Sequence, residues 1–231
     1  MPVALPDVTV VAVDCVAHEL TRMAIEDTLR EVEPFETIVW TNNHAALRGR
    51  DVWSLDCDCR SLDDVARVLW YEVPARVRTS HFLVVQWDGW VLDGARWDPA
   101  WLDADYFGAP WHWHGDGLTV GNGGFSLRST DMARWVAANP GGYPALAGEN
   151  EDVTLCRRYR SELQRDGFVW GSRAQAEEFS FERDPLRPAF GFHGAWNWPL
   201  VLTPERLAER IDRANDYVRG KIEWAELMAL V

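Results

Sequence analysis

Short apolar runs alternate with helical patterns over residues 8–88, and this alternation constrains the fold more than any other feature of the sequence. The runs are rich in β-branched residues, which pack well on a pleated surface, so they predict buried strands. They are residues 8–14, 37–41, 52–55 and 82–85. Residues 18–32 and 61–74 carry apolar side chains at helical spacing. Strands and helices in this order predict an α/β protein with a mostly parallel central sheet and helices on both faces.

Polar residues stand where three of the predicted strands end: Asp14, Asn42 and Asp88. Ligands bind at the carboxyl ends of the strands in open α/β sheets, so we expect these side chains along one functional edge. The alternative for Asp88, which precedes Gly89, is a solvated turn aspartate. Neither a dinucleotide-binding glycine motif nor a P-loop follows any of these strands, which argues against dehydrogenases and P-loop kinases or ATPases.

The composition limits the partners and the compartment. A net charge of -13 argues against a nucleic-acid backbone or an anionic membrane as the main partner, because both would be repelled. No apolar run predicts a transmembrane segment, and the N-terminal residues do not resemble a secretory signal. The four cysteines form no disulfide framework, and Cys57 and Cys59 alone do not make the roughly four-ligand set of a zinc site. We therefore expect a cytoplasmic protein.

The composition of the sequence changes after residue 92. Residues 93–124 are rich in Trp, Gly, Asp and Pro, and so long a connection predicts a functional loop. Trp111 and Trp113 in this loop, and Trp196 later in the chain, are candidates for ligand binding, because indole rings cover the apolar faces of sugars or bases. The alternative is that the 14 tryptophans simply fill the core.

Further helices are predicted from caps and apolar spacing. Ser61 with Asp64 three residues later predicts a capped start for the helix at 61–74. Two more helices are predicted at residues 131–138 and 151–166. A last helix is predicted to begin at Pro204 and to continue through Ile222 as one element.

A glycine-rich segment at residues 120–128 is the second strong feature. Gly121, Asn122, Gly123 and Gly124 let the backbone adopt positive φ angles and let a ligand approach without a Cβ in the way. Arg128 could neutralise a phosphate or pair with a carboxylate. The alternative is a hairpin turn at Asn122–Gly123 with Arg128 as an ordinary surface cation.

Two acids and a histidine complete the candidate chemistry. Glu151 and Asp152 follow Asn150 at a predicted helix start, where either carboxylate could accept a proton from a hydroxyl group. The alternative is that Asn150 caps the helix and the acids interact with its dipole. His193 lies between Gly191 and Gly194 in the sequence Phe-Gly-Phe-His-Gly, which indicates that another group passes close to it.

These motifs together resemble a bacterial family of unknown function that is similar to GT-A-type glycosyltransferases. The resemblance rests on Gln-x-Asp-Gly, Gly-Ala-Pro-Trp, Gly-Asn-Gly-Gly-Phe-Ser-Leu-Arg, Glu-Asp-Val and Phe-Gly-Phe-His-Gly elements in this order. It spans most of the chain. It implies one glycosyltransferase-like domain over 1–231, with a nucleotide-binding half at 1–95 and a donor-sugar and acceptor half at 96–231.

The resemblance also implies roles for single residues. Asp88 matches the last acid of the D-x-D motif and His193 the late histidine, so both are candidates to hold Mn²⁺ or Mg²⁺ with the donor diphosphate. Asp152 matches the base of inverting enzymes, with Glu151 beside it. Gln86 replaces the first acid of D-x-D, and a neutral amide is a poorer ligand for these ions. The residues expected to bind the donor are Asp14, Asn42, Gln86, Asp88, Gly121, Asn122, Gly123, Gly124 and Arg128.

The resemblance thus implies a glycosyltransferase that moves a sugar from a nucleotide-diphosphate donor to a hydroxyl-bearing acceptor, with inversion, and Trp111, Trp113 and Trp196 are then the residues expected to bind the acceptor. The alternative is a catalytically inert nucleotide-sugar or carbohydrate-binding module on the same fold.

Overall fold

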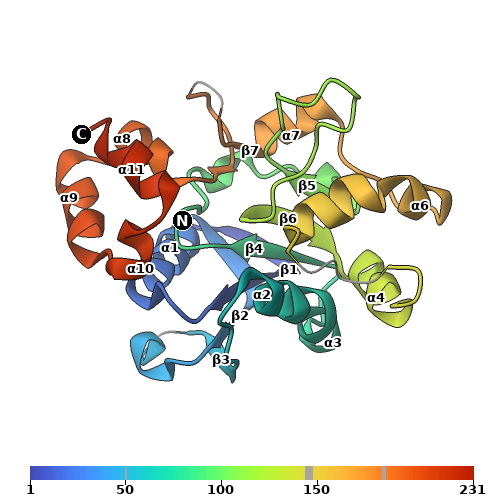
Figure 1. Cartoon of the computed structure of the whole chain (residues 1–231), viewed down its shortest axis with the longest axis horizontal. Helices are drawn as coiled ribbons and strands as arrows, with labels where there is room; N and C mark the ends of the chain where they lie inside the picture. The colour runs from blue at the N-terminus through green and yellow to red at the C-terminus, as the bar shows by residue number, and fades with distance from the viewer. Residues whose placement is uncertain (50, 144–147, 184–185) are drawn as a thin grey trace.

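A computed structural model describes residues 1–49, 51–143, 148–183 and 186–231. Its centre is a six-stranded sheet of order β3-β2-β1-β4-β6-β5 (Figure 1). The strands are β1 (Val3–Asp14), β2 (Val32–Thr41), β3 (Trp53–Asp56), β4 (His81–Val85), β5 (Tyr106–Gly108) and β6 (Phe125–Ser129). β1 pairs in parallel with β2 and β4, and β2 pairs in parallel with β3. The predicted mostly parallel α/β sheet is therefore confirmed.

The exception to the parallel arrangement is β6, which the sequence patterns did not predict. It runs antiparallel to both β4 and β5, with Val85 opposite Phe125 and His81 opposite Ser129. All of its side chains are buried, as expected for an interior strand covered on both faces. Because β6 belongs to the predicted second half and β4 to the first, one sheet spans both.

The predicted helices of the first half are present. α1 (His18–Glu31) ends where β2 begins, at Val32. α2 (Leu62–Arg67) starts with the predicted capping box: the amide of Asp64 donates to Oγ of Ser61, and the amide of Ser61 donates to Oδ2 of Asp64. A π-helical turn, η2 (Val68–Glu72), and α3 (Val73–Arg76) follow.

The second half packs helices and two short strands against this sheet. They are α4 (Thr130–Ala138), α5 (Glu151–Val153), the π-helical η5 (Thr154–Arg158), α6 (Arg160–Arg165), α7 (Arg173–Phe179), β7 (Ser180–Phe181), β8 (Gly191–Phe192) and α8 (Trp198–Val201). The 3-10 turns are η1 (His44–Leu47), η3 (Gly94–Arg96), η4 (Pro99–Asp103) and η6 (Ala195–Asn197). Trp101, Phe107 and Phe179 form a buried aromatic cluster, so the segment at 93–124 partly fills the core.

The prediction of one continuous C-terminal helix is wrong. The chain forms three helices, α9 (Pro204–Arg213), α10 (Asp216–Arg219) and α11 (Ile222–Met228). The break has a local cause, because the side chain of Asn215 accepts a hydrogen bond from the amide of Val218 and so starts a new helix. Ile222, predicted to be in the buried stripe, is exposed.

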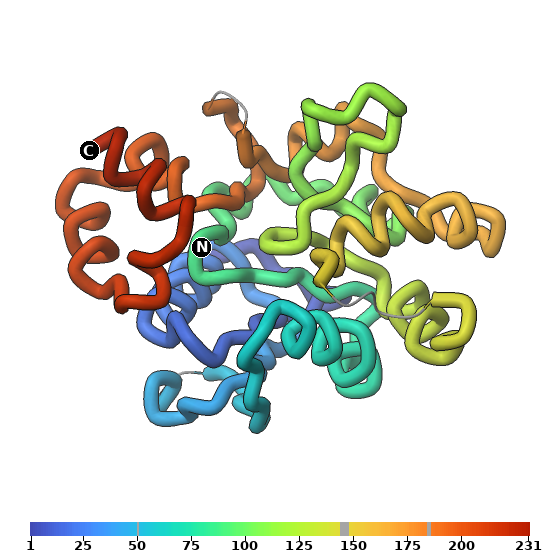
Figure 2. Tube along the Cα trace, viewed as in Figure 1, coloured from blue at the N-terminus to red at the C-terminus, as the bar shows by residue number. Residues whose placement is uncertain are grey.

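A buried arginine fixes these helices against the sheet domain. Arg210 of α9 is fully buried, donates to Asp27 of α1 at 2.6 Å, and lies over the ring of Trp90 at 3.8 Å. The Cα trace shows the C-terminal segment in red beside α1 in blue (Figure 2). In the described part of the chain, no helix combines the length and apolarity that a membrane span requires.

Candidate active site

A cleft of about 250 Å³ opens beyond the carboxyl end of β4. The order of strands places β1 between β2 and β4, so the chain changes direction across the sheet at β1, where α/β proteins commonly bind ligands. The cleft is lined by Leu62, Val65, Leu69, Gln86, Trp87, Asp88, Gly123, Gly124, Asn150, Glu151, Asp152, His193, Tyr217, Lys221 and Glu223. Six separate segments of the chain therefore build it.

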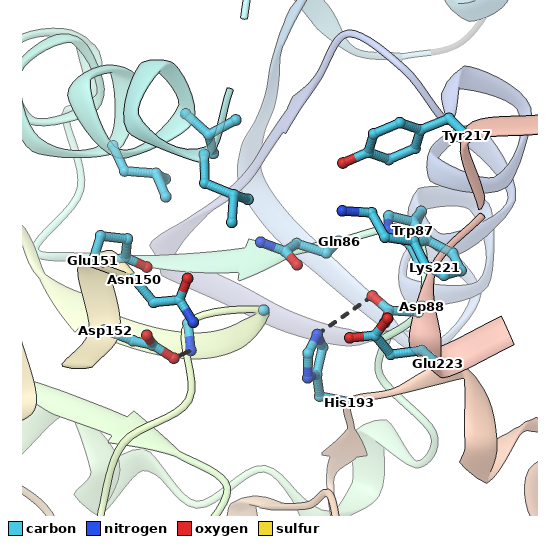
Figure 3. Close-up of a pocket in the computed structure, with 15 residues that line it drawn as sticks. Gln86, Trp87, Asp88, Asn150, Glu151, Asp152, His193, Tyr217, Lys221 and Glu223 are labelled. Atoms are coloured by element: carbon cyan, nitrogen blue, oxygen red, sulfur yellow. Dashed lines mark hydrogen bonds and ion pairs between the residues drawn. The ribbon is translucent and has the colours of Figure 1, made fainter. Parts of the chain in front are cut away.

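Asp88 and His193 meet on one side of the cleft (Figure 3). Nε2 of His193 lies 3.3 Å from Oδ1 of Asp88. The contact is an ion pair without hydrogen-bond geometry, and both atoms are buried with no hydrogen-bond partner among the described residues. The pair thus presents a carboxylate oxygen and an imidazole nitrogen that the protein itself leaves unsatisfied.

The other nitrogen of His193 fixes the ring. Nδ1 lies 3.2 Å from Oε1 of Glu182 and 3.1 Å from Nδ2 of Asn122. Burial lowers the pKa of His193, but the charges of Asp88 and Glu182 outweigh burial and raise the pKa well above its ordinary value. The imidazolium form therefore prevails near neutral pH when no other cation faces Asp88.

The glycine segment packs tightly against this histidine. A Cβ on Gly124 would stand 1.9 Å from Nε2 of His193, and a Cβ on Gly123 would stand 2.4 Å from Oε1 of Glu151. Asn122 adopts a positive φ of 69°, and its side-chain oxygen accepts from the amides of Gly124 and Phe125. The alternative of a hairpin turn is not observed, since the segment leads into β6 through this side-chain turn instead.

Asp152 lies on the opposite side of the cleft from Asp88 and His193 (Figure 3). Its Oδ2 accepts from the amide of Gly123 at 2.8 Å, and its Oδ1 accepts from the amide of Val153 at 2.7 Å. Burial, followed by the charge of Glu151, raises the pKa of Asp152 to about 6. A carboxylate with this pKa is mostly ionised at pH 7 and can accept a proton.

Glu151, in contrast, is held by Arg128. Both carboxylate oxygens of Glu151 accept from the guanidinium, at 2.7 and 2.8 Å, and Arg128 is only 3% exposed. Arg128 is thus neither the surface cation of the alternative interpretation nor a lining residue of the cleft. Asn150 precedes the helix, but its side chain makes no capping hydrogen bond.

The C-terminal helices contribute Tyr217, Lys221 and Glu223, which the sequence reasoning missed. The ammonium group of Lys221 lies 4.4 Å from the centre of the Tyr217 ring and extends into the cleft (Figure 3). Lys221 is the only lysine in the sequence. Its rarity could have drawn attention to this residue without a structure.

Several predicted site residues lie outside the cleft. Asp14 accepts from the amides of Val16 and Ala17 and so shapes the turn into α1. The side chain of Asn42 lies 2.7 Å from Nε2 of His18 at the same edge of the sheet. A Cβ on Gly121 would stand within 2.5 Å of the ring of Trp111. The structure therefore gives these residues local packing and turn roles and does not bring them to Asp88.

The three candidate acceptor-binding tryptophans differ in their surroundings. Trp111 is buried over Gly121, and Trp113 is exposed beyond it. Trp196 donates its indole N–H to the carbonyl of Glu182, and the guanidinium of Arg183 lies 3.6 Å from its ring centre. None of the three lines the cleft.

The donor set at Asp88 and His193 fits a divalent cation. Mn²⁺ and Mg²⁺ take carboxylate oxygens, and substrate phosphates commonly complete their coordination. In the carboxylate–histidine arrangement of metal sites, Nδ1–H faces a carboxylate, as Nδ1 of His193 faces Glu182, and Nε2 is left to the ion. The buried oxygen and nitrogen without hydrogen-bond partners are the atoms that would hold it.

A family model described as "Protein of unknown function (DUF5672)" matches residues 67–193, more than half of the chain. The chain belongs to this family. The matched range includes Asp88, the glycine segment, Asp152 and His193, but it ends before Lys221. No curated protein matches the sequence.

Solved glycosyltransferase structures resemble the whole chain. The apo-form glycosyltransferase GlyE of Streptococcus pneumoniae TIGR4 aligns with 99% of this chain and 63% of its own, at TM-score 0.51 and 13% identity. The mannosyltransferase PcManGT of Pyrobaculum calidifontis was solved in complex with GDP-Man and Mn²⁺. It aligns with 96% of this chain and 69% of its own, at TM-score 0.51 and 12% identity. A glycosyltransferase involved in glycosylation of the major capsid of PBCV-1 aligns with 90% of this chain and 98% of its own, at TM-score 0.49 and 13% identity. The fold is GT-A-like.

Proposed function

We propose that this protein is a glycosyltransferase that transfers a sugar from a nucleotide-diphosphate donor to a hydroxyl group of an acceptor. One observation carries the proposal: the Asp88–His193 pair and Asp152 face each other across one cleft at the carboxyl end of β4. The GT-A-like fold supports it, because glycosyltransferases use this architecture.

The diphosphate of the donor would lie against Asp88, His193 and Lys221. Asp88 and His193 would hold Mn²⁺ or Mg²⁺, whose positive charge would stabilise the diphosphate as it leaves. Lys221 supplies a second positive charge from the C-terminal side of the cleft. The donor role first expected for Arg128 passes to Lys221, since Arg128 is buried against Glu151.

The volume of the cleft limits what it encloses. At about 250 Å³ it falls just below the ~300–1,000 Å³ of pockets that enclose drug-sized ligands. We therefore place the diphosphate and the sugar ring here. The nucleoside would extend along the sheet edge toward Asn42 and His18, whose paired side chains are exposed.

Asp152 would act as the base. The acceptor oxygen forms a bond to the anomeric carbon, the bond from that carbon to the diphosphate breaks, and its electron pair leaves with the diphosphate. Asp152 takes the proton of the acceptor hydroxyl. Asp152 lies on the opposite side of the cleft from Asp88 and His193 (Figure 3), so the acceptor would approach the sugar from the side opposite to the leaving diphosphate, which favours inversion of the sugar carbon.

One observation favours the alternative of an inert binding module. Gln86 lines the cleft at the position of the first acid of D-x-D, so an oxygen ligand with a negative charge is missing there. Such a module would bind the donor through Asp88, His193 and Lys221 without transferring the sugar.

Donor binding can be tested by thermal denaturation with UDP-, GDP-, CMP- and dTDP-sugars, each with Mn²⁺ and with EDTA. A ligand at ten times its Kd stabilises the folded state by about 1.4 kcal/mol. We expect one nucleotide class to raise the Tm with Mn²⁺ and to do so less with EDTA or in Asp88→Asn, while Asp103→Asn, an exposed acid outside the cleft, behaves as the parent. Failure of every donor to raise the Tm under any condition would contradict the proposal.

A further inference from the structure

Three of the four cysteines meet at a second place at the carboxyl edge of the sheet. Cys15 follows β1, and Cys57 and Cys59 follow β3. Their three Sγ atoms all lie within 4.8 Å of one another, and none of the three residues lines the cleft. The fold brings them together across 42 and 44 residues of sequence, so the short Cys57–Cys59 spacing alone did not reveal the cluster.

The spacing of the sulfur atoms suits a shared ion. Sγ of Cys15 lies 3.3 Å from Sγ of Cys57, which lies 3.9 Å from Sγ of Cys59. With metal–sulfur bonds of about 2.3 Å, two thiolates on a tetrahedral or trigonal ion stand about 4 Å apart. The distance from Cys57 to Cys59 agrees with this value, and the distance from Cys15 to Cys57 is shorter by roughly half an ångström.

The surroundings of the sulfur atoms also suit a cation. The amide of Cys59 donates to Sγ of Cys15 at 3.3 Å, which stabilises negative charge on that sulfur.

The donor set is all sulfur. Asp58, between the two later cysteines, turns away and accepts from Nε of Arg60 at 2.9 Å. Soft thiolate ligands select Zn²⁺ and Cu⁺ over Mg²⁺ and Mn²⁺. Cys57 is only half-buried, so a water molecule can reach the cluster as a fourth ligand for Zn²⁺, whereas Cu⁺ is satisfied by three thiolates.

We propose that Cys15, Cys57 and Cys59 form a binding site for one thiophilic metal ion, Zn²⁺ or Cu⁺. The ion would tie the end of β1 to the segment that leads into α2. Since Leu62, Val65 and Leu69 of that helical region line the cleft, the ion would hold one wall of the cleft in place. The cysteine cluster would bind the ion whether or not the cleft transfers a sugar.

Metal titration of the reduced full-length protein tests the site. Co²⁺ is the first probe, because bound thiolates give it a near-ultraviolet charge-transfer band that carboxylate and imidazole ligands at Asp88 and His193 would not produce. Zn²⁺ and, without oxygen, Cu⁺ are then titrated against chromogenic chelators. We expect one ion per chain and a higher Tm for the metal-loaded protein.

Variants show which residues hold the ion. Cys57→Ser, a substitution at the most accessible member, should weaken binding by more than about tenfold and remove most of the charge-transfer band. Cys156→Ser is the matched control, because Cys156 is buried beside Trp170 and outside the cluster. The proposal is overturned if the reduced parent gives no charge-transfer band, or if Cys57→Ser binds Zn²⁺ and Cu⁺ as the parent does. It is also overturned if the three thiols bind none of the ions and only form a Cys15–Cys57 disulfide on oxidation.

Discussion

Arg128 and Glu151 form a buried ion pair with two hydrogen bonds, from Nη2 to Oε1 at 2.7 Å and from Nη1 to Oε2 at 2.8 Å. The pair joins β6 to the start of α5 and thereby positions the next residue, Asp152, at the cleft. It also gives the two neighbouring acids different surroundings: Glu151 is paired with a fixed cation, whereas Asp152 accepts hydrogen bonds from the backbone amides of Gly123 and Val153.

Replacement of Glu151 by Gln should lower the free energy of unfolding by about 3 kcal/mol, because it leaves the Arg128 charge buried without a partner. Denaturant titration measures this loss. Glu149→Gln is the matched control, since Glu149 pairs with the largely exposed Arg158 and its loss should be below about 1 kcal/mol. Equal losses in the two variants would show that the buried pair does not stabilise α5.

The rate of sugar transfer should depend on the ionisation of Asp152. Burial and the charge of Glu151 raise the pKa of Asp152 to about 6, so kcat/KM should fall about tenfold for each pH unit below that value. This group does not destabilise the fold on acidification. Its pKa is higher in the folded than in the unfolded state, so its effect on stability is most favourable below about pH 4 and diminishes as the pH rises to 6. If kcat/KM, measured with saturating donor, stays constant down to pH 5, a group other than Asp152 accepts the proton.

Gly124 should not tolerate a side chain. A Cβ at this position would stand 1.9 Å from Nε2 of His193, so Gly124→Ala should displace the imidazole from Asp88 and weaken donor binding by about tenfold or more. Gly115→Ala is the control, because a Cβ there meets no atom within 4 Å. Titration of both variants with the best donor checks the expectation, and a Gly124→Ala variant that binds as the parent does would separate His193 from the donor site.

Lys221 should contact the diphosphate. Lys221→Ala should weaken donor binding by about tenfold, the scale of one hydrogen bond to a charged group, while Lys221→Arg should retain most of the affinity. Arg213→Ala, an exposed substitution on the neighbouring α9, controls for general charge. Because Lys221 is the only lysine, amine acetylation followed by mass spectrometry reports its protection by a nucleoside diphosphate at a single side chain. Unchanged acetylation at saturating nucleotide would contradict the contact.

Local signals in the sequence predicted the parts of the fold that depend on neighbouring residues. The capping box of Ser61 and Asp64 and the helix that starts at Glu151 are examples, since both arise within a few residues. β6 was missed because a short buried strand lacks alternation and follows a glycine turn. The last helix was overextended because apolar spacing continues past Asn215, where a side-chain cap decides the break.

The candidate site was predictable in its residue types more than in its pairings. Asp88, Asp152 and His193 stand at strand or helix ends and beside glycines, so their positions were visible as sequence patterns. The Arg128–Glu151 pair and the cysteine cluster depend on contacts between distant segments, which a single sequence does not display. Lys221 reaches the cleft only because α9, α10 and α11 turn the chain back toward the sheet.

The turnover of Asp152→Asn decides whether this protein is a transferase with Asp152 as its base. The variant should bind the donor with the affinity of the parent, because its cleft partners Asp88, His193 and Lys221 are unchanged. Its rate of sugar transfer at pH 7 should fall by about 10²-fold or more, the usual contribution of a general base, while Glu149→Gln transfers at the parent rate. An Asp152→Asn variant that binds the donor and transfers sugar at the parent rate would contradict the proposed role of Asp152.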